Sequence, residues 1–116
     1  MGILVSENVV RAVQGYVYRE VDKVRVKGKQ KVIAIFEPIG AQGTVGGEVL
    51  AEIARFHQAL AHFRAQRWDE ADALLQELAA NEPQAKLYRL YRERIADFRA
   101  RPPGPDWDGV FGFTTK

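Results

Sequence analysis

The first forty residues follow the two-residue period of β-strands. Residues 23–27 alternate between basic residues and valine, and residues 16–20 and 31–37 are rich in β-branched and aromatic residues, so all three read as extended segments. The alternation of apolar and polar residues shifts by one position at residues 21–22, as it does at a β-bulge or kink. Gly28 and Lys29 supply a turn, and Pro38 is predicted to end the last segment. The pattern predicts a hairpin whose first strand is kinked.

A short strand and a short helix are predicted before this hairpin. Residues 3–5 form a short apolar run, and Ser6 followed by Glu7 is typical of a helix N-cap and first turn. The helix should continue to Val13, and Gly15 should end it. The predicted order is therefore strand, helix, strand, strand.

Apolar residues after position 47 recur at the three-and-four spacing of helices. Three such stripes are Val49, Ile53, Phe56, Leu60 and Phe63; then Ala71, Leu74, Leu75 and Leu78; then Leu87, Leu90, Tyr91, Ile95 and Phe98. Short connections favour antiparallel neighbours, and each stripe must be buried, so we expect the helices to pack together and onto the sheet. The fold class is α+β: a small β-α-β-β sheet unit followed by three antiparallel helices.

These patterns divide the chain into four segments. We expect a sheet portion at residues 1–40, a glycine-rich linker at 41–47, a helical portion at 48–101 and a tail rich in proline and aromatic residues at 102–116.

Charge and composition narrow the class of protein. The formal net charge of the 116 residues is only +2, which is too small to indicate a nucleic-acid-binding protein. The positive charge is concentrated in residues 1–45, which hold seven Lys and Arg against four Asp and Glu. The chain has no cysteine, and its apolar runs are far shorter than the roughly 18 residues of a membrane span. We therefore expect a cytoplasmic protein without direct membrane insertion or a targeting signal.

The first two predicted helices resemble one tetratricopeptide repeat. The resemblance rests on residues 63–71, followed by Leu75, Leu78 and Pro83, with Ala59 at the small-residue position of the first helix. It implies helical packing roles for Ala59, Trp68, Ala71, Leu75 and Leu78. A solenoid with a binding groove needs about three repeats, so a packing scaffold is favoured over a peptide-binding groove.

The sheet portion resembles the closing strands of a class III adenylate/guanylate cyclase homology domain. The resemblance covers residues 3–40 and is carried by residues 3–7, 19–29 and 32–38, with the turn Val26-Lys27-Gly28-Lys29. The helical region that ends with residues 105–111 resembles the C-terminal extension of bacterial membrane-linked cyclases of this class. The resemblance implies that Lys27 lies beside the nucleotide triphosphate. Gly28, which stands between the two strand patterns, is predicted to be a structural turn residue. Alternatively, the basic residues are only the solvated face of a hairpin.

The elements that carry catalysis in that family have no counterpart in this chain. Its metal-binding aspartates, base-recognition residues and transition-state asparagine and arginine all precede the matching portion. We therefore predict a C-terminal fragment or degenerate relative that is inactive alone and holds no cofactor, whereas the parent would be a purine nucleotide cyclase, a phosphorus-oxygen lyase using Mg²⁺ or Mn²⁺. Its partners would be the remainder of the cyclase domain and, by self-association, further copies of the chain.

Other candidate chemistry is weaker. His57 and His62 are five residues apart, which places them on different helix faces, so no metal site is predicted. Trp107, Phe111 and Phe113 form either an apolar tail that docks on the helices or a partner-binding segment. Two functions stay open: a structural or regulatory part of a cyclase in intracellular signal transduction, and an independent interaction module built on one helical repeat.

Overall fold

The computed structural model describes residues 3–26 and 31–111 of the chain. The chain divides into two compact units, which are considered separately. The sheet unit contains the described residues up to Gly47 and from Asp108 onward, and the helical unit contains residues 48–107.

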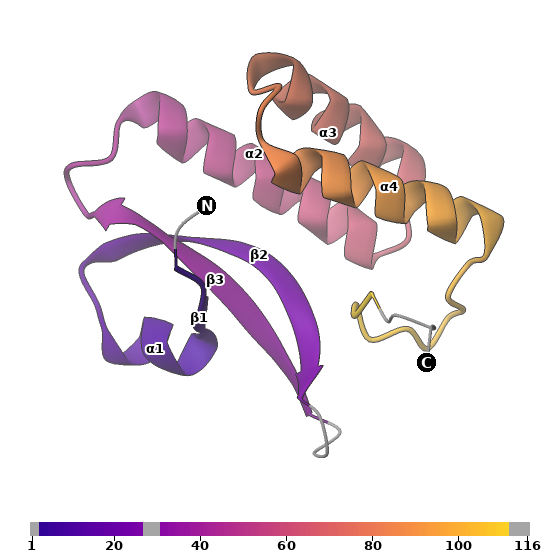
Figure 1. Cartoon of the computed structure of the whole chain (residues 1–116), viewed down its shortest axis with the longest axis horizontal. Coiled ribbons are helices and arrows are strands. Elements are labelled where there is room, and N and C mark those ends of the chain that lie inside the picture. Colours follow the sequence, from indigo (N-terminus) through magenta and orange to yellow (C-terminus); the bar gives the residue numbers. More distant parts are fainter. Residues whose placement is uncertain (1–2, 27–30, 112–116) are drawn as a thin grey trace. The chain divides into compact units, whose positions relative to one another are not determined.

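The sheet unit has the predicted order of strand, helix, strand and strand (Figure 1). Its elements are β1 (Val5–Ser6), α1 (Glu7–Ala12), β2 (Tyr16–Val26) and β3 (Lys31–Ala41). All pairings are antiparallel, and β3 lies between β1 and β2. Gly15 makes the turn from α1 into β2 with φ +90°, a backbone conformation that glycine adopts without strain.

Two irregularities bend the β2–β3 ladder. Val21 is an extra residue of β2, because its two neighbours pair with consecutive residues of β3, and this confirms the predicted kink at residues 21–22. Ile39 is likewise an extra residue of β3. Long strands with such bulges twist more strongly than regular ones.

The prediction that Pro38 ends the third strand is wrong, because β3 continues to Ala41. Pro38 directly precedes the bulge residue Ile39, and it lies beyond Ile35 and Phe36, the two residues of β3 that pair with β1. Proline is tolerated at such a position because bulges and unpaired edges do not require its missing N–H. The glycine-rich connection to the first long helix is consequently shorter than predicted.

The helical unit consists of the three predicted helices. They are α2 (Gly47–Arg64), α3 (Trp68–Asn81) and α4 (Lys86–Ala100). Consecutive helices run in opposite directions, as the short connections require (Figure 1). No helix of the described residues is both long and apolar enough to cross a bilayer.

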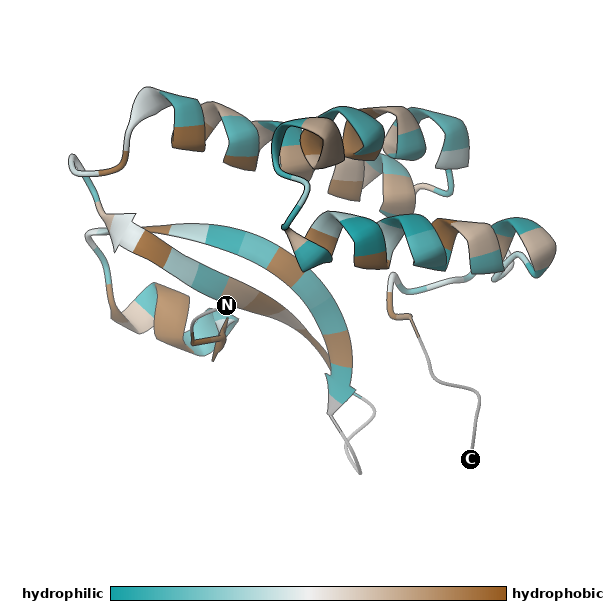
Figure 2. Ribbon diagram, turned by 45° about the horizontal axis from the view of Figure 1, so that its top comes forward, coloured by the Kyte–Doolittle hydropathy of each residue, from teal (hydrophilic) through white to brown (hydrophobic). Residues whose placement is uncertain are grey.

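The core of the helical unit is built on the three apolar stripes. Figure 2 shows apolar segments recurring between polar ones along these helices. Its buried apolar side chains are Ile53, Phe56, Ala59, Leu60, Phe63, Ala71, Leu75, Leu78, Leu87, Tyr88, Tyr91 and Ile95. Val49 and Leu90 were expected in these stripes, but both are exposed, whereas Tyr88 and Arg94 are buried without having been predicted. The Tyr88 hydroxyl donates to the Glu52 carboxylate, which satisfies its polar end.

Aromatic rings close the end of the helical unit where α2 and α4 finish and α3 begins. The Phe63 ring lies 5.6 Å from that of Trp68, 5.9 Å from that of Phe98 and 5.4 Å from that of Trp107, measured between centroids. The segment before Trp107 is fixed by Gln66, whose Nε2 donates to the Gly104 carbonyl at 2.6 Å. Trp107 therefore docks on the helices, whereas Phe113 of the predicted tail lies outside the described residues.

We predict that Phe63→Ala strongly destabilises the helical unit. Loss of a fully buried phenyl ring typically lowers the free energy of unfolding by about 3–5 kcal/mol. Leu90→Ala is the matched control, because Leu90 is exposed and should change the free energy of unfolding by about 0.5 kcal/mol or less. Urea unfolding followed by circular dichroism measures both, and equal effects of the two variants would show that the aromatic cluster is not the core.

Candidate functional site

The β2–β3 hairpin is the candidate site, because the cyclase resemblance places a nucleotide contact on it. Lys27 and Gly28 lie outside the described residues, so their roles stay predictions. The pair of Val26 with Lys31 is the last step of the ladder before them. The structure thus describes both strands that lead to this segment.

Lys23, Arg25 and Lys31 are the described basic residues of the run at positions 23–31. Lys31 is exposed and Lys23 is half-buried. Arg25 has a defined partner far along the chain: its Nη2 donates to Oδ2 of Asp108 at 2.6 Å. Arg25 is therefore more than part of a solvated basic face.

Asp108 belongs to a turn of its own. Its Oδ1 accepts the N–H of Val110 at 3.1 Å, and Gly109 between them has φ +89°. The Val110 amide and the Arg25 guanidinium together hold the pKa of Asp108 below its ordinary value, although partial desolvation opposes them. The carboxylate is thus stabilised in its ionised form.

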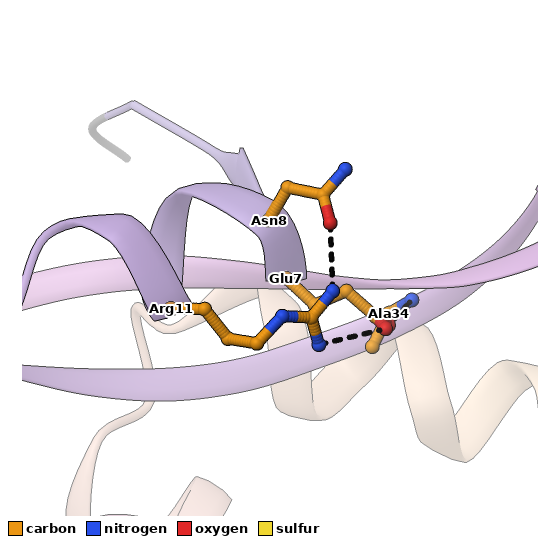
Figure 3. A network of polar contacts seen from close by, with 4 residues as sticks. All are labelled: Glu7, Asn8, Arg11 and Ala34. Carbon is orange, nitrogen blue, oxygen red and sulfur yellow. Dashed lines mark hydrogen bonds and ion pairs between the residues drawn. The ribbon is translucent and has the colours of Figure 1, made fainter.

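Glu7 ties α1 to the middle strand of the sheet (Figure 3). Its Oε1 accepts the N–H of Ala34 at 3.0 Å, and its Oε2 lies 3.5 Å from Nη1 of Arg11. Arg11 is oriented in turn by Asn8, whose Oδ1 accepts from Nη2 at 2.7 Å. The Ala34 amide, with Arg11 as a smaller contributor, lowers the pKa of Glu7 from its ordinary value of 4.5.

The backbone amide of Lys23, the residue opposite Ala34, also donates to a carboxylate. Ala34 pairs with Lys23 across the ladder, and the N–H of Lys23 donates to Oδ1 of Asp22 at 2.8 Å. Both amides of this pair therefore donate to carboxylates. Because unpaired amides at strand edges recruit foreign strands, these two carboxylates also discourage unwanted pairing at this position.

A second ion pair joins β2 and β3. Arg19 and Glu37 are direct neighbours across the ladder, with Nη2 and Oε1 2.6 Å apart. Their side chains are only 17% and 14% exposed. Removing one partner would leave a poorly solvated charge and would therefore be destabilising.

Four carboxylates of the sheet unit take part in hydrogen bonds within the protein. Glu7, Asp22, Glu37 and Asp108 each accept a hydrogen bond from an amide or a guanidinium of the protein. Nucleotidyl chemistry on two cations needs carboxylates that hold them about 4 Å apart. Across residues 3–26 and 31–111, no three His, Asp or Glu side chains are grouped to bind a metal ion.

The residues predicted from the tetratricopeptide resemblance gather in the helical unit. Ala59, Ala71, Leu75 and Leu78 are buried there. Trp68 is half-buried and stacks on Phe98, with ring centroids 5.3 Å apart. The predicted site residues therefore fall into two groups, one on the hairpin and one in a helical core.

An open groove of about 490 Å³ runs along α3 and α4. Its polar lining includes Arg89, Arg92 and Arg99 of α4 and Asp72 of α3. Burial would raise the pKa of Asp72, but hydrogen bonds from Arg92 and Gln76 outweigh it, so the pKa lies below its ordinary value. Arg92 and Asp72 thus form a fixed ion pair, with Nε and Oδ1 2.8 Å apart.

Sequence reasoning missed two of the contacts that organise the hairpin. The sequence predicts Glu7 as a first-turn residue of a helix, but no local pattern names Ala34 as its partner. Asp108 and Gly109 carry a usable signal, because an Asp-Gly pair is a turn signature, but that signal does not identify Arg25.

Comparisons of the chain with protein-family models, with curated proteins and with solved structures find no match. A functional assignment therefore rests on the residues, their contacts and the resemblance of the sequence.

We predict that Glu7→Gln loosens α1 from β3. Since the pKa of Glu7 is lowered in the folded protein, its ionised form stabilises the fold above about pH 4.5, and this contribution is lost as the pH falls through the lowered value. The protection factor of the Ala34 amide, followed by NMR from roughly pH 6 to pH 3, should fall with acid in the unaltered chain and be low throughout in the variant. Glu70→Gln, at an exposed residue of α3, is the control. Identical acid profiles for Glu7→Gln and the unaltered chain would contradict the role of Glu7.

Proposed function

We propose that the chain is the C-terminal part of a class III adenylate/guanylate cyclase. In this proposal the sheet unit closes a catalytic domain whose remainder precedes it, and the helical unit is a structural or regulatory extension. The parent acts in the cytoplasm in cyclic nucleotide synthesis and signal transduction. The chain by itself is catalytically inactive.

The exposed apolar surface of the sheet unit is the observation that carries this proposal. Ile3, Leu4, Val9 and Val13, which we call the α1 surface, are between 38% and 74% exposed. α1 itself contributes no buried residue. All four residues lie within α1 or within four residues of it in the sequence, and a contiguous exposed apolar surface usually marks a site that another part of a protein covers.

The sheet unit also buries too little to be self-sufficient. Among its described residues, Val21 is the only large apolar side chain that is fully buried. A fully buried side chain of this kind contributes roughly 1.5–3 kcal/mol, whereas ordering one residue costs about 1–2 kcal/mol of backbone entropy. A covering partner, which we identify as the preceding part of the catalytic domain, would supply the missing burial.

We propose that the hairpin and the preceding part of the domain supply different residues to the catalytic site. The resemblance assigns Lys27 to a phosphate of the nucleotide, where an ammonium group offsets developing negative charge. In the family that the sequence resembles, the metal-binding aspartates precede the matching portion, so we assign them to the remainder of the domain. The hairpin would thus complete a site that other elements build.

An interaction module is the second candidate, and the helical unit favours it. This unit has its own aromatic core and carries the groove along α3 and α4. Such a module would not depend on the α1 surface. Variants of that surface therefore separate the two candidates.

The purified chain should form no cyclic nucleotide from ATP or GTP with Mg²⁺ or Mn²⁺. Chromatography of the products tests this directly, and cyclic product from the chain alone would contradict the proposal.

Calorimetric titration with ATP or GTP tests the predicted role of the hairpin: any heat of binding should be abolished by Lys27→Ala. Lys86→Ala, at an exposed lysine of the helical unit, is the matched control. A heat that persists in Lys27→Ala would exclude the phosphate role of Lys27.

We predict that the isolated chain self-associates through the α1 surface. Light scattering should give a mass above that of one chain, and Val9→Lys should shift it toward the monomer, because a charge in an apolar interface is costly to desolvate. Leu50→Lys is the matched control, since Leu50 is a similarly exposed apolar residue of α2. A strictly monomeric unaltered chain, or dissociation by Leu50→Lys alone, would count against the proposal and favour the interaction module.

A further inference from the structure

The far end of the hairpin is a ribbon of two strands. β1 pairs only with Ile35 and Phe36, so residues 31–33 of β3 pair with residues 24–26 of β2 and, among the described strands, with no other. A two-stranded ribbon is only marginally stable in water by itself. This end of the hairpin needs a further contact if it is to be held in one position.

The Asp108 turn provides such a contact. Asp108 lies 83 residues from Arg25 in the sequence, yet the carboxylate and the guanidinium are 2.6 Å apart. Arg25 pairs with Val32 in the ladder, which places the ion pair within the two-stranded part. The C-terminal segment is therefore attached where the ribbon lacks a third strand.

The geometry of Asp108 suits it to this task. One carboxylate oxygen accepts the Val110 amide and the other accepts Arg25, so the turn orients the carboxylate toward the strand. Gly109 is buried and has φ +89°, a conformation in which a side chain would be strained. A carboxylate held by its own turn loses less side-chain entropy on pairing than the freely rotating partners of an ordinary surface ion pair.

We infer that Asp108 is a positioning residue for the hairpin, which it holds by docking the turn of residues 108–110 on β2 through Arg25. Arg25 is two residues before Lys27, so the turn fixes the strand that leads directly into the predicted phosphate contact. The value of that position for nucleotide binding rests on the proposed function, whereas the docking itself does not.

Hydrogen exchange measured by mass spectrometry on the full chain tests this inference. Arg25→Gln and Asp108→Asn should each accelerate exchange in residues 24–26 and 31–33 by roughly twofold to fivefold, the range that corresponds to a partly exposed ion pair. The double variant should exchange no faster than the single variants, because both remove the same contact. Arg25→Lys, which keeps the charge, should restore much of the protection.

Glu77→Gln is the matched control. It removes an exposed ion pair with Arg55 in the helical unit and should leave the hairpin unchanged. Unchanged exchange in Asp108→Asn, additive effects of the two variants or an equal effect of Glu77→Gln would each overturn the inference. Failure of the proposed function is distinguishable, because cyclic product from the chain alone, or a heat of nucleotide binding that persists in Lys27→Ala, would contradict it while the exchange results still held.

Discussion

The antiparallel ladder between β2 and β3 is the interaction on which the sheet unit depends. β1 has two residues and α1 has six, and elements of this length do not persist alone in water. Each is attached to the ladder by a specific contact: β1 by pairing with β3, and α1 by Glu7 on the Ala34 amide. The C-terminal segment joins it through Asp108 and Arg25. The sheet unit thus consists of the β2–β3 ladder, with β1, α1 and the C-terminal segment attached to it by hydrogen bonds and an ion pair.

The helical unit has a different source of stability. Phe63 contacts rings from α3, α4 and the segment that follows α4. Among the described residues, most of the large buried side chains lie in these helices. It therefore possesses the apolar core that the sheet unit lacks. This contrast is what we expect when one part of a chain folds around its own core and the other completes a larger domain.

Periodicity predicted the elements well, because period and turn residues are local properties. The order of the sheet unit, the kink at Val21 and the three helices all followed from spacing. The extension of β3 past Pro38 did not, because it depends on which edge of the strand is paired. Similarly, the helical spacing cannot decide that Leu90 is exposed while Tyr88 is buried, since that depends on how the helices face each other.

The candidate site was harder to predict for a related reason. A resemblance named Lys27 from its neighbours in the sequence, but the contacts that organise the described hairpin join residues far apart. Arg25 reads as one basic residue among several until Asp108 is placed beside it. Glu7 reads as a helix-terminal acid until the Ala34 amide is found against it. Such pairs are products of the tertiary fold and leave no spacing signal.

Native-state hydrogen exchange, followed residue by residue in increasing denaturant, tests the central claim most directly. If the sheet unit is the closing part of a larger domain, the amides of β2 and β3 in the isolated chain should open with a much lower free energy than those of α2, α3 and α4, and they should do so before the helices unfold. Strand amides that are as well protected as the helical ones, and that exchange only with global unfolding, would show that the sheet unit is complete without a partner and would contradict the claim.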